Sequence, residues 1–122
     1  MYKLSVKTEF SAAHNLRHYK GKCEALHGHN WKVEAVISAK KTDTNGLAMD
    51  FHEIKDILKE TLEELDHKHL NQIAYFKKNN PTSENIACYL FGRLDGQLKK
   101  GLVYLSEVTV WESDNCSATY CK

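Results

Sequence analysis

Three histidines near the start of the chain are the residues best suited to chemistry. His14 stands alone, His27 and His29 form a His-Gly-His, and Cys23 precedes that motif by four residues. Three neutral imidazoles with one open position are typical of a catalytic zinc site, whereas a structural zinc site uses four protein ligands. A nearby thiol that need not bind the metal suggests a nucleophile or a base. The sequence therefore predicts a Zn²⁺ enzyme with His14, His27 and His29 as metal ligands.

Alternating apolar and polar residues indicate that two strands carry these histidines. The alternation covers residues 2–14 and 27–39, with the period of half-buried strands. His14, His27 and His29 share the parity of the apolar residues in their strands, so all three are expected to face inward at one end of a sheet. The glycine of the His-Gly-His is expected to leave room for close approach. One such histidine is usually a core residue with a hydrogen-bond partner, but three in register favour a metal site.

Composition limits the remaining possibilities. The chain has 122 residues, 42% of them hydrophobic, which suits one domain spanning residues 1–122. A net charge of +1 gives no reason to expect nucleic-acid binding. No apolar run reaches transmembrane length and no signal-peptide pattern follows Met1, so no membrane partner is expected. The four cysteines form no C-x-x-C pair, which favours reduced thiols and a cytoplasmic location.

Two helices are expected after the second strand. The first begins at Asp50, an acidic cap, and its apolar spacing continues to near Asp66. A breaker that ends in a proline follows, and Thr82 or Ser83 then caps a second helix that stops by Gly101.

Residues 102–112 and 115–121 are expected to form two more strands, joined by a short turn. The resulting order, ββααββ, predicts an α+β domain with two helices on one face of an antiparallel four-stranded sheet. Nothing in the sequence protects the outer strands, and joining of subunits at these edges would cover them.

Three further features each have a functional and a plain interpretation. Asp66 and His67 suit a proton relay, or they are ordinary polar residues at the end of a helix, where the helix dipole favours histidine. Glu112 has the parity of apolar neighbours, so it either faces a ligand with N–H donors or is an exposed turn residue. The basic loop 17–22 suits an anionic, phosphorylated substrate, or it is a solvated loop.

Taken together, these motifs resemble the 6-pyruvoyl-tetrahydropterin synthase family over nearly the whole chain. The resemblance rests on the following residues: His14, Cys23-x-x-x-His27-Gly28-His29, Asp66-His67, Pro81-Thr82-Ser83-Glu84-Asn85 and Glu112. The short gap between Cys23 and His27 is similar to that of the 6-carboxy-tetrahydropterin synthase branch, which serves the queuosine pathway. One other branch has a glutamate in place of the cysteine, and members with dual activity have a glutamate directly before the His-Gly-His. This chain has Leu26 directly before the His-Gly-His, and Glu24 stands at a different position and is expected to be exposed.

The resemblance implies a tunnelling fold, in which subunits join their sheets into barrels. It further implies a homohexamer of two trimers with sites at subunit interfaces. The implied substrate is 7,8-dihydroneopterin triphosphate, and the implied products are 6-carboxy-tetrahydropterin, acetaldehyde and triphosphate.

Roles for individual residues also follow from the resemblance. Zinc on His14, His27 and His29 would bind the side-chain hydroxyls of the substrate. Cys23 would accept a proton, Asp66 with His67 would form a second relay, and Glu112 would hold the N–H edge of the pterin. The start of the second helix would lie near the pterin, through Thr82, Ser83 and Glu84.

Two alternatives stay open on this sequence. One is an enzyme of the same family that forms the 6-pyruvoyl product without cleaving a carbon–carbon bond. The other is a non-catalytic module that binds zinc or a pterin. Product analysis and a turnover assay separate them.

Overall fold

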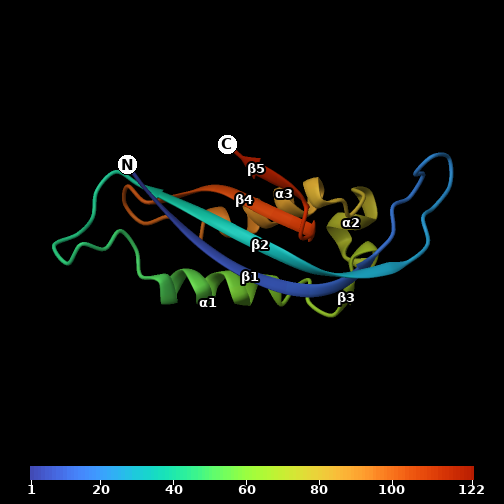
Figure 1. Cartoon of the computed structure of the whole chain (residues 1–122), viewed down its shortest axis with the longest axis horizontal. Coiled ribbons are helices and arrows are strands. Elements are labelled where there is room, and N and C mark those ends of the chain that lie inside the picture. Colours follow the sequence, from blue (N-terminus) through green and yellow to red (C-terminus); the bar gives the residue numbers. More distant parts are fainter.

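A five-stranded sheet built on two long strands forms the scaffold (Figure 1). The computed structural model describes residues 1–122. In spatial order the strands are β3 (Lys68–His69), β1 (Tyr2–His14), β2 (His27–Ala39), β4 (Tyr104–Ser113) and β5 (Cys116–Cys121). β3 runs parallel to β1, and all other neighbours are antiparallel.

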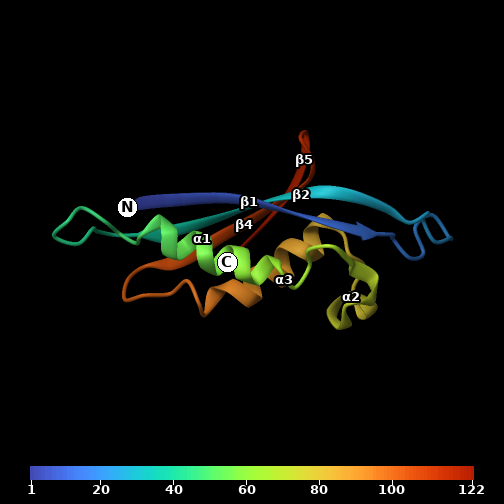
Figure 2. The ribbon, with the colours of Figure 1, turned by 90° about the horizontal axis from the view of Figure 1, so that it is seen from below.

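The helices lie on one face of this sheet (Figure 2). They are α1 (Phe51–Leu62), α2 (Ala74–Lys78) and α3 (Ser83–Asp95), with a 3₁₀ turn at Leu70–Gln72. One cluster of buried side chains fills the space between the sheet and the helices, and it includes Trp31, Leu58 and Leu90. No helix is both long enough and apolar enough to span a membrane.

The register between β1 and β2 places the histidines together. His14 pairs with His27, and Ala12 pairs with His29. The predicted alternation is confirmed in β1, where Phe10, Ala12 and His14 are buried while the residues between them are more exposed. The three histidines therefore lie at the same end of the sheet and on its helix-covered side.

Helix α1 begins as predicted and ends earlier than predicted. Asp50 caps it, because its carboxylate accepts a hydrogen bond from the backbone N–H of His52 at 2.8 Å. The helix stops at Leu62, and a turn leads to His67, whose φ of 57° is left-handed. This turn sends the chain back to the edge of β1, where β3 pairs. Apolar spacing alone did not reveal the turn, because Leu65 is fully buried although it lies outside the helix.

The second predicted helix is α3, with Thr82 as its cap. The hydroxyl of Thr82 accepts from the N–H of Asn85 at 3.1 Å. The helix ends at Asp95, and the segment to Gly101 forms turns.

The ββααββ order and the α+β class are confirmed, with two additions to the expected elements. The short strand β3 joins the antiparallel four-stranded sheet and makes it mixed, and the short helix α2 joins the two expected helices. A two-residue strand and a five-residue helix are too short to leave a periodic pattern in the sequence. The open edges are β5 and the part of β1 that β3 does not reach.

Candidate metal centre

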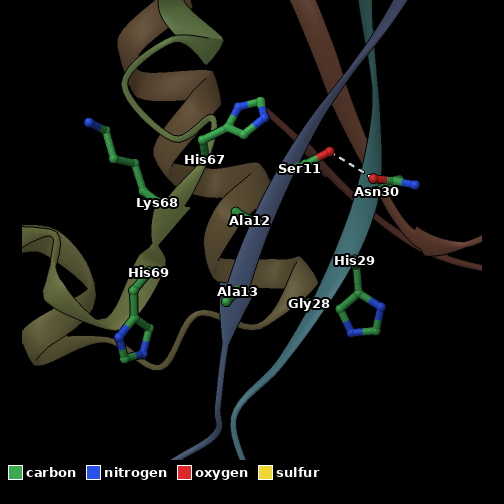
Figure 3. A pocket seen from close by; sticks show the side chains of 9 residues that line it. All are labelled: Ser11, Ala12, Ala13, Gly28, His29, Asn30, His67, Lys68 and His69. Atoms are coloured by element: carbon green, nitrogen blue, oxygen red, sulfur yellow. Dashed lines mark hydrogen bonds between the residues drawn. The ribbon is translucent and has the colours of Figure 1, made fainter.

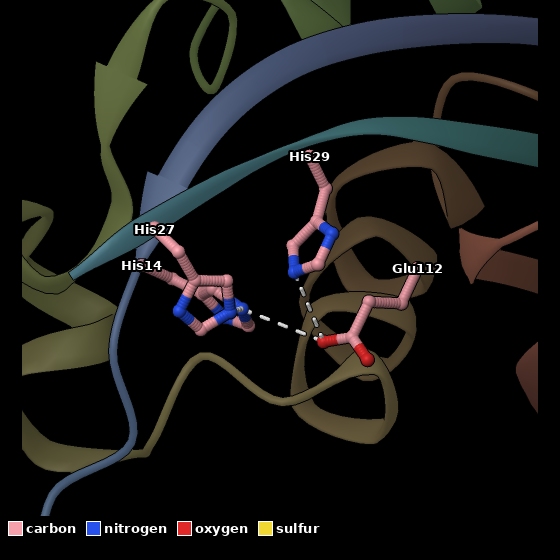
Figure 4. A group of neighbouring side chains, drawn as sticks. All are labelled: His14, His27, His29 and Glu112. Atoms are coloured by element: carbon pink, nitrogen blue, oxygen red, sulfur yellow. Dashed lines mark hydrogen bonds and ion pairs between the residues drawn. The ribbon is translucent and has the colours of Figure 1, made fainter. Parts of the chain in front are cut away.

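Three imidazoles and one carboxylate converge at the end of β1 and β2 (Figure 4). One ligand atom from each of His14, His27, His29 and Glu112 lies within 4.8 Å of the others. The Nε2 atoms of His14 and His27 are 3.0 Å apart. Oε1 of Glu112 is 3.4 Å from Nε2 of His14 and 3.6 Å from Nε2 of His29.

Backbone carbonyls hold the outer nitrogens of two of these rings. Nδ1 of His14 lies 2.7 Å from the carbonyl oxygen of Pro81, and Nδ1 of His27 lies 2.9 Å from that of Ala25. A ring that donates its Nδ1–H to a carbonyl presents an unprotonated Nε2, the arrangement usual in metal-binding histidines. Burial lowers the pKa of His14, so this ring is neutral at pH 7.

The residues fit a zinc ion. A tetrahedral site with Zn–N distances of about 2.0–2.1 Å separates its nitrogens by roughly 3.3 Å, close to the spacing seen between the two Nε2 atoms. Nε2 of His29 is buried and has no hydrogen-bond partner. A buried nitrogen without a partner destabilises the fold, and a bound metal ion would remove that cost. The carboxylate of Glu112 lies within 4.8 Å of the three ring nitrogens. The group therefore offers three nitrogens and one adjacent oxygen acceptor to a cation.

Glu112 reaches this group from β4. It shares the predicted parity with Val108 and Val110, which are fully buried, while its own side chain is 39% exposed. The pairing of β4 with β5 is irregular between Trp111 and Ser113, where the hairpin bends. Glu112 is thus neither a core residue nor a free turn residue, since its carboxylate faces the histidines.

The predicted pair of Asp66 and His67 forms in the turn after α1. Oδ1 of Asp66 accepts from the N–H of Ser11 at 2.9 Å and lies 3.0 Å from Nδ1 of His67. The N–H of His67 donates to the carbonyl of Ser11 at 2.6 Å, so both residues are fixed on β1. The hydrogen bond from Ser11, with the contact to His67, lowers the pKa of Asp66 and keeps it ionised.

An open hollow of about 530 Å³ lies over the ends of β1 and β2, next to β3 (Figure 3). His67 lines it from the turn before β3, and His29 lines it from β2. The ring of His67 is 83% exposed, so it is free to meet a bound molecule. The glycine of the His-Gly-His is not required for space, because a Cβ at Gly28 would sit at an ordinary 3.7 Å from the carbonyl of Ala12.

The other predicted residues lie around this centre without touching it. Cys23 is exposed in the loop between β1 and β2 and is not a member of the metal group. Thr82 serves as the cap of α3, and Ser83 and Glu84 follow in its first turn, with Glu84 exposed. In the basic loop, the guanidinium of Arg17 donates a hydrogen bond to the carbonyl of Phe76 at 2.6 Å. The other basic side chains of this loop are exposed.

Three residues near the site have roles that the sequence did not indicate. Asn71 and Asn80 bind the backbone that follows His14. Glu24, expected to be exposed, is half-buried, and its carboxylate accepts from the N–H of Leu16 at 3.2 Å. Polar residues in loops give no periodic signal, so only the folded chain reveals these contacts.

Comparison with known proteins decides the family. The family model described as 6-pyruvoyl tetrahydropterin synthase matches residues 3–122. The chain belongs to the 6-pyruvoyl tetrahydropterin synthase family. Its tunnelling-type fold is shared by the 6-pyruvoyl tetrahydropterin synthase of Caenorhabditis elegans, with a TM-score of 0.85 and 25% identity over 99% of this chain and 95% of that one.

Relatives within the family carry more than one activity in their names. The chain is 34% identical to the 6-carboxy-5,6,7,8-tetrahydropterin synthase of Rickettsia bellii, over 95% of this chain and 97% of that protein. It is also 34% identical to the dihydroneopterin monophosphate aldolase of Pyrococcus furiosus, over 88% of this chain and 87% of that protein.

Proposed function

We propose that residues 1–122 form a single-domain, zinc-dependent carbon–carbon lyase. It converts 7,8-dihydroneopterin triphosphate and one water molecule to 6-carboxy-5,6,7,8-tetrahydropterin, acetaldehyde and triphosphate, in queuosine biosynthesis in the cytoplasm. The observation that carries the proposal is the cluster of three imidazoles beside the hollow reached by His67, in a chain of this family. The similarity to the Rickettsia bellii enzyme supports the choice of product.

His14, His27 and His29 would hold the zinc ion, which supplies Lewis-acid polarisation of the substrate hydroxyls. The two carbonyls of Pro81 and Ala25 keep two of these rings in a fixed orientation. This preorganisation matters because a substrate bound to the metal is positioned only as accurately as the histidines that hold the metal.

Two groups move protons in this proposal. Cys23 accepts a proton from the substrate side chain. His67 exchanges a second proton, while Asp66 orients its ring and stabilises the imidazolium. The contacts of Asp66 and His67 with Ser11 support this role, because they leave the His67 ring exposed and its backbone fixed.

Glu112 accepts hydrogen bonds from the substrate. A pterin offers a ring N–H and an exocyclic amine side by side, and one carboxylate can accept both. Glu112 lies 3.4 and 3.6 Å from two of the nitrogens that would hold the metal, which supports this role. Thr82, Ser83 and Glu84 lie next to Pro81, which contacts His14, and we assign them to the pterin side of the site.

Completion of the site by a second subunit is part of the proposal. In one chain Cys23 is exposed and outside the metal group, and His67 is also exposed. A neighbouring subunit joined at an open sheet edge would bury such groups. Together with the assembly that the family resemblance implies, these features support our proposal of a homohexamer built from two trimers.

Identification of products by mass tests the activity. The protein loaded with zinc is incubated with 7,8-dihydroneopterin triphosphate, and 6-carboxy-tetrahydropterin with acetaldehyde is the expected outcome. A 6-pyruvoyl product would favour the synthase activity in the family name, and the relative named as a dihydroneopterin monophosphate aldolase adds an aldolase activity as a third outcome. Binding without turnover would leave a zinc or pterin-binding module.

A further inference from the structure

Two side-chain amides hold the backbone that leaves the metal centre. Asn71 accepts from the N–H of Asn15 at 3.0 Å and donates to its carbonyl at 2.7 Å. Asn80 accepts from the N–H of Arg17 at 2.9 Å and donates to its carbonyl at 2.9 Å. Each amide satisfies both backbone groups of one residue, as a neighbouring strand would. The guanidinium of Arg17 adds a third contact, to Phe76.

Asn80 belongs to a closed turn at the start of α3. Its carbonyl accepts from the N–H of Thr82 and from Nδ2 of Asn85, each at 2.8 Å. The next residue, Pro81, offers its carbonyl to Nδ1 of His14 at 2.7 Å. Adjacent residues of one rigid turn therefore hold a metal-site imidazole and the start of the loop that carries Cys23.

The loop beyond Arg17 depends on such anchors. His18 and Lys20 have φ values of 59° and 52°, a left-handed conformation that costs energy for residues with a Cβ. Conformations of this kind persist where the surrounding contacts hold them. At its far end the loop is closed between Leu16 and Glu24, by the N–H of Glu24 to the carbonyl of Leu16 at 2.9 Å. Both ends of the loop are fixed, and its middle is solvated.

We propose that Asn80 is a positioning residue that couples the orientation of His14 to the placement of the Cys23 loop. It acts through the backbone of Arg17 and through the turn that presents the Pro81 carbonyl. The effect on turnover rests on the proposed activity and the effect on Zn²⁺ affinity rests on the proposed metal site, whereas the effect on the loop rests on neither.

Limited proteolysis with trypsin tests the placement of the loop. Arg17, Lys20 and Lys22 are the cleavage sites within it. Because cleavage of a native protein follows the population of its open form, Asn80→Ala is expected to be cut there at least roughly tenfold faster than wild type. The matched control is Asn79→Ala, since this neighbouring amide is also half-buried but bonds only the carbonyl of Tyr75, at 3.0 Å within the end of α2. The control should be cut at the wild-type rate.

Zn²⁺ affinity and kinetics provide the second readout. Competition with a chromogenic chelator should show Zn²⁺ binding weakened by roughly threefold to tenfold in Asn80→Ala and unchanged in Asn79→Ala, since the contacts that orient ligands affect metal affinity. In turnover, kcat should fall more than KM rises. Asn80→Asp keeps the acceptor for the Arg17 N–H and loses the donor, so intermediate values are expected, and it replaces the alanine variant if that does not fold.

Loop cleavage and Zn²⁺ affinity at the level of the Asn79→Ala control, in whichever Asn80 variant folds, would overturn the proposal. Absence of pterin turnover in the wild type would instead overturn the proposed function. In that case proteolysis and Zn²⁺ affinity still decide the role of Asn80.

Discussion

Burial separates the two kinds of histidine in this chain. His14 is 1% exposed, and burial lowers its pKa, so it is a neutral ring suited to bind a cation. His67 is 83% exposed and lies 3.0 Å from the carboxylate of Asp66, a setting that suits a proton carrier. Two histidines near one site therefore have different surroundings, one suited to binding a cation and the other to carrying a proton.

Removal of one metal ligand should remove the metal. His27→Ala is expected to lose zinc and activity together, whereas wild type should hold about one zinc per chain, as a three-histidine site predicts. Elemental analysis of the purified proteins measures this. His52→Ala, which changes an exposed histidine at the start of α1, is the control and should keep both. A zinc-free His27→Ala protein with full activity would contradict the metal assignment.

Cys23→Ala should separate chemistry from binding. The variant is expected to fold and to bind zinc, because Cys23 is exposed and lies outside the metal group. Its turnover should fall by about 10²-fold or more, the usual effect of removing a general base. Steady-state kinetics with metal analysis measures both properties. Cys88→Ala should change stability at most, and near-native turnover of Cys23→Ala would remove Cys23 from the mechanism.

Glu112→Gln tests substrate recognition at the metal centre. The change replaces one acceptor oxygen with a donor that faces the N–H groups of the pterin, and a charged hydrogen bond is worth about 1.5–3 kcal/mol. Pterin affinity, measured by calorimetric titration, should fall at least roughly tenfold. Zinc content should stay unchanged, since three histidines remain. Loss of zinc would show instead that Glu112 is a metal ligand, and equal pterin affinities would place the pterin anchor elsewhere.

At the scale of helices and strands, the sequence predicts the elements that have a periodic apolar pattern. It misses turns and side-chain contacts that leave no such pattern. Alternation placed His14 and His29 on the inward faces of β1 and β2, and the structure agrees. The predicted end of α1 is wrong, because the buried Leu65 continues the apolar spacing beyond the helix and into the turn. The sequence does not indicate the hydrogen bonds of the Asn80 side chain, because its partner is the backbone of a residue 63 positions away. Contacts of that kind depend on the folded chain and not on any local pattern.

Glu64 connects the turn after α1 to α3. Its carboxylate accepts from the hydroxyl of Tyr89 at 2.8 Å and from Nε of Arg93 at 3.1 Å. The hydrogen bond from Arg93 lowers the pKa of Glu64, and burial together with the bond to Glu64 raises the pKa of Tyr89 to about 12. The turn that continues to Asp66 is therefore tied to the helix layer as well as to β1.

Glu64→Gln should lower stability in a pH-dependent way. The native pKa of Glu64 is below its unfolded value, so the ionised form stabilises the fold above that value, and the effect disappears as pH falls through the native pKa. Because the pair is partly exposed, the loss at pH 7 is expected to be about 1 kcal/mol or less. Urea unfolding from pH 7 to pH 3 measures it. A difference from wild type that persists unchanged at the acidic end would rule out this charge as its cause.

For the whole molecule, the open edges of the sheet are the dominant feature. Both β5 and much of β1 present unpaired backbone groups, and the face away from the helices is uncovered (Figure 2). Unpaired edges favour association with further strands. Light scattering during gel filtration should give a hexamer or another multiple of three, with the proposed barrel as the reason. A stable and fully active monomer would contradict both the barrel and the shared site.

The position of the histidines along the chain has a consequence for linkage between metal and folding. Only residues 15–26 separate His14 from the His-Gly-His of His27 and His29, while Glu112 comes from β4, near the other end of the chain. Closing so short a loop costs little entropy, so the unfolded chain keeps part of its affinity for a cation. A ligand stabilises the native state only by the excess of its native affinity over its unfolded affinity. Zinc should therefore raise the melting temperature by less than its native affinity alone implies.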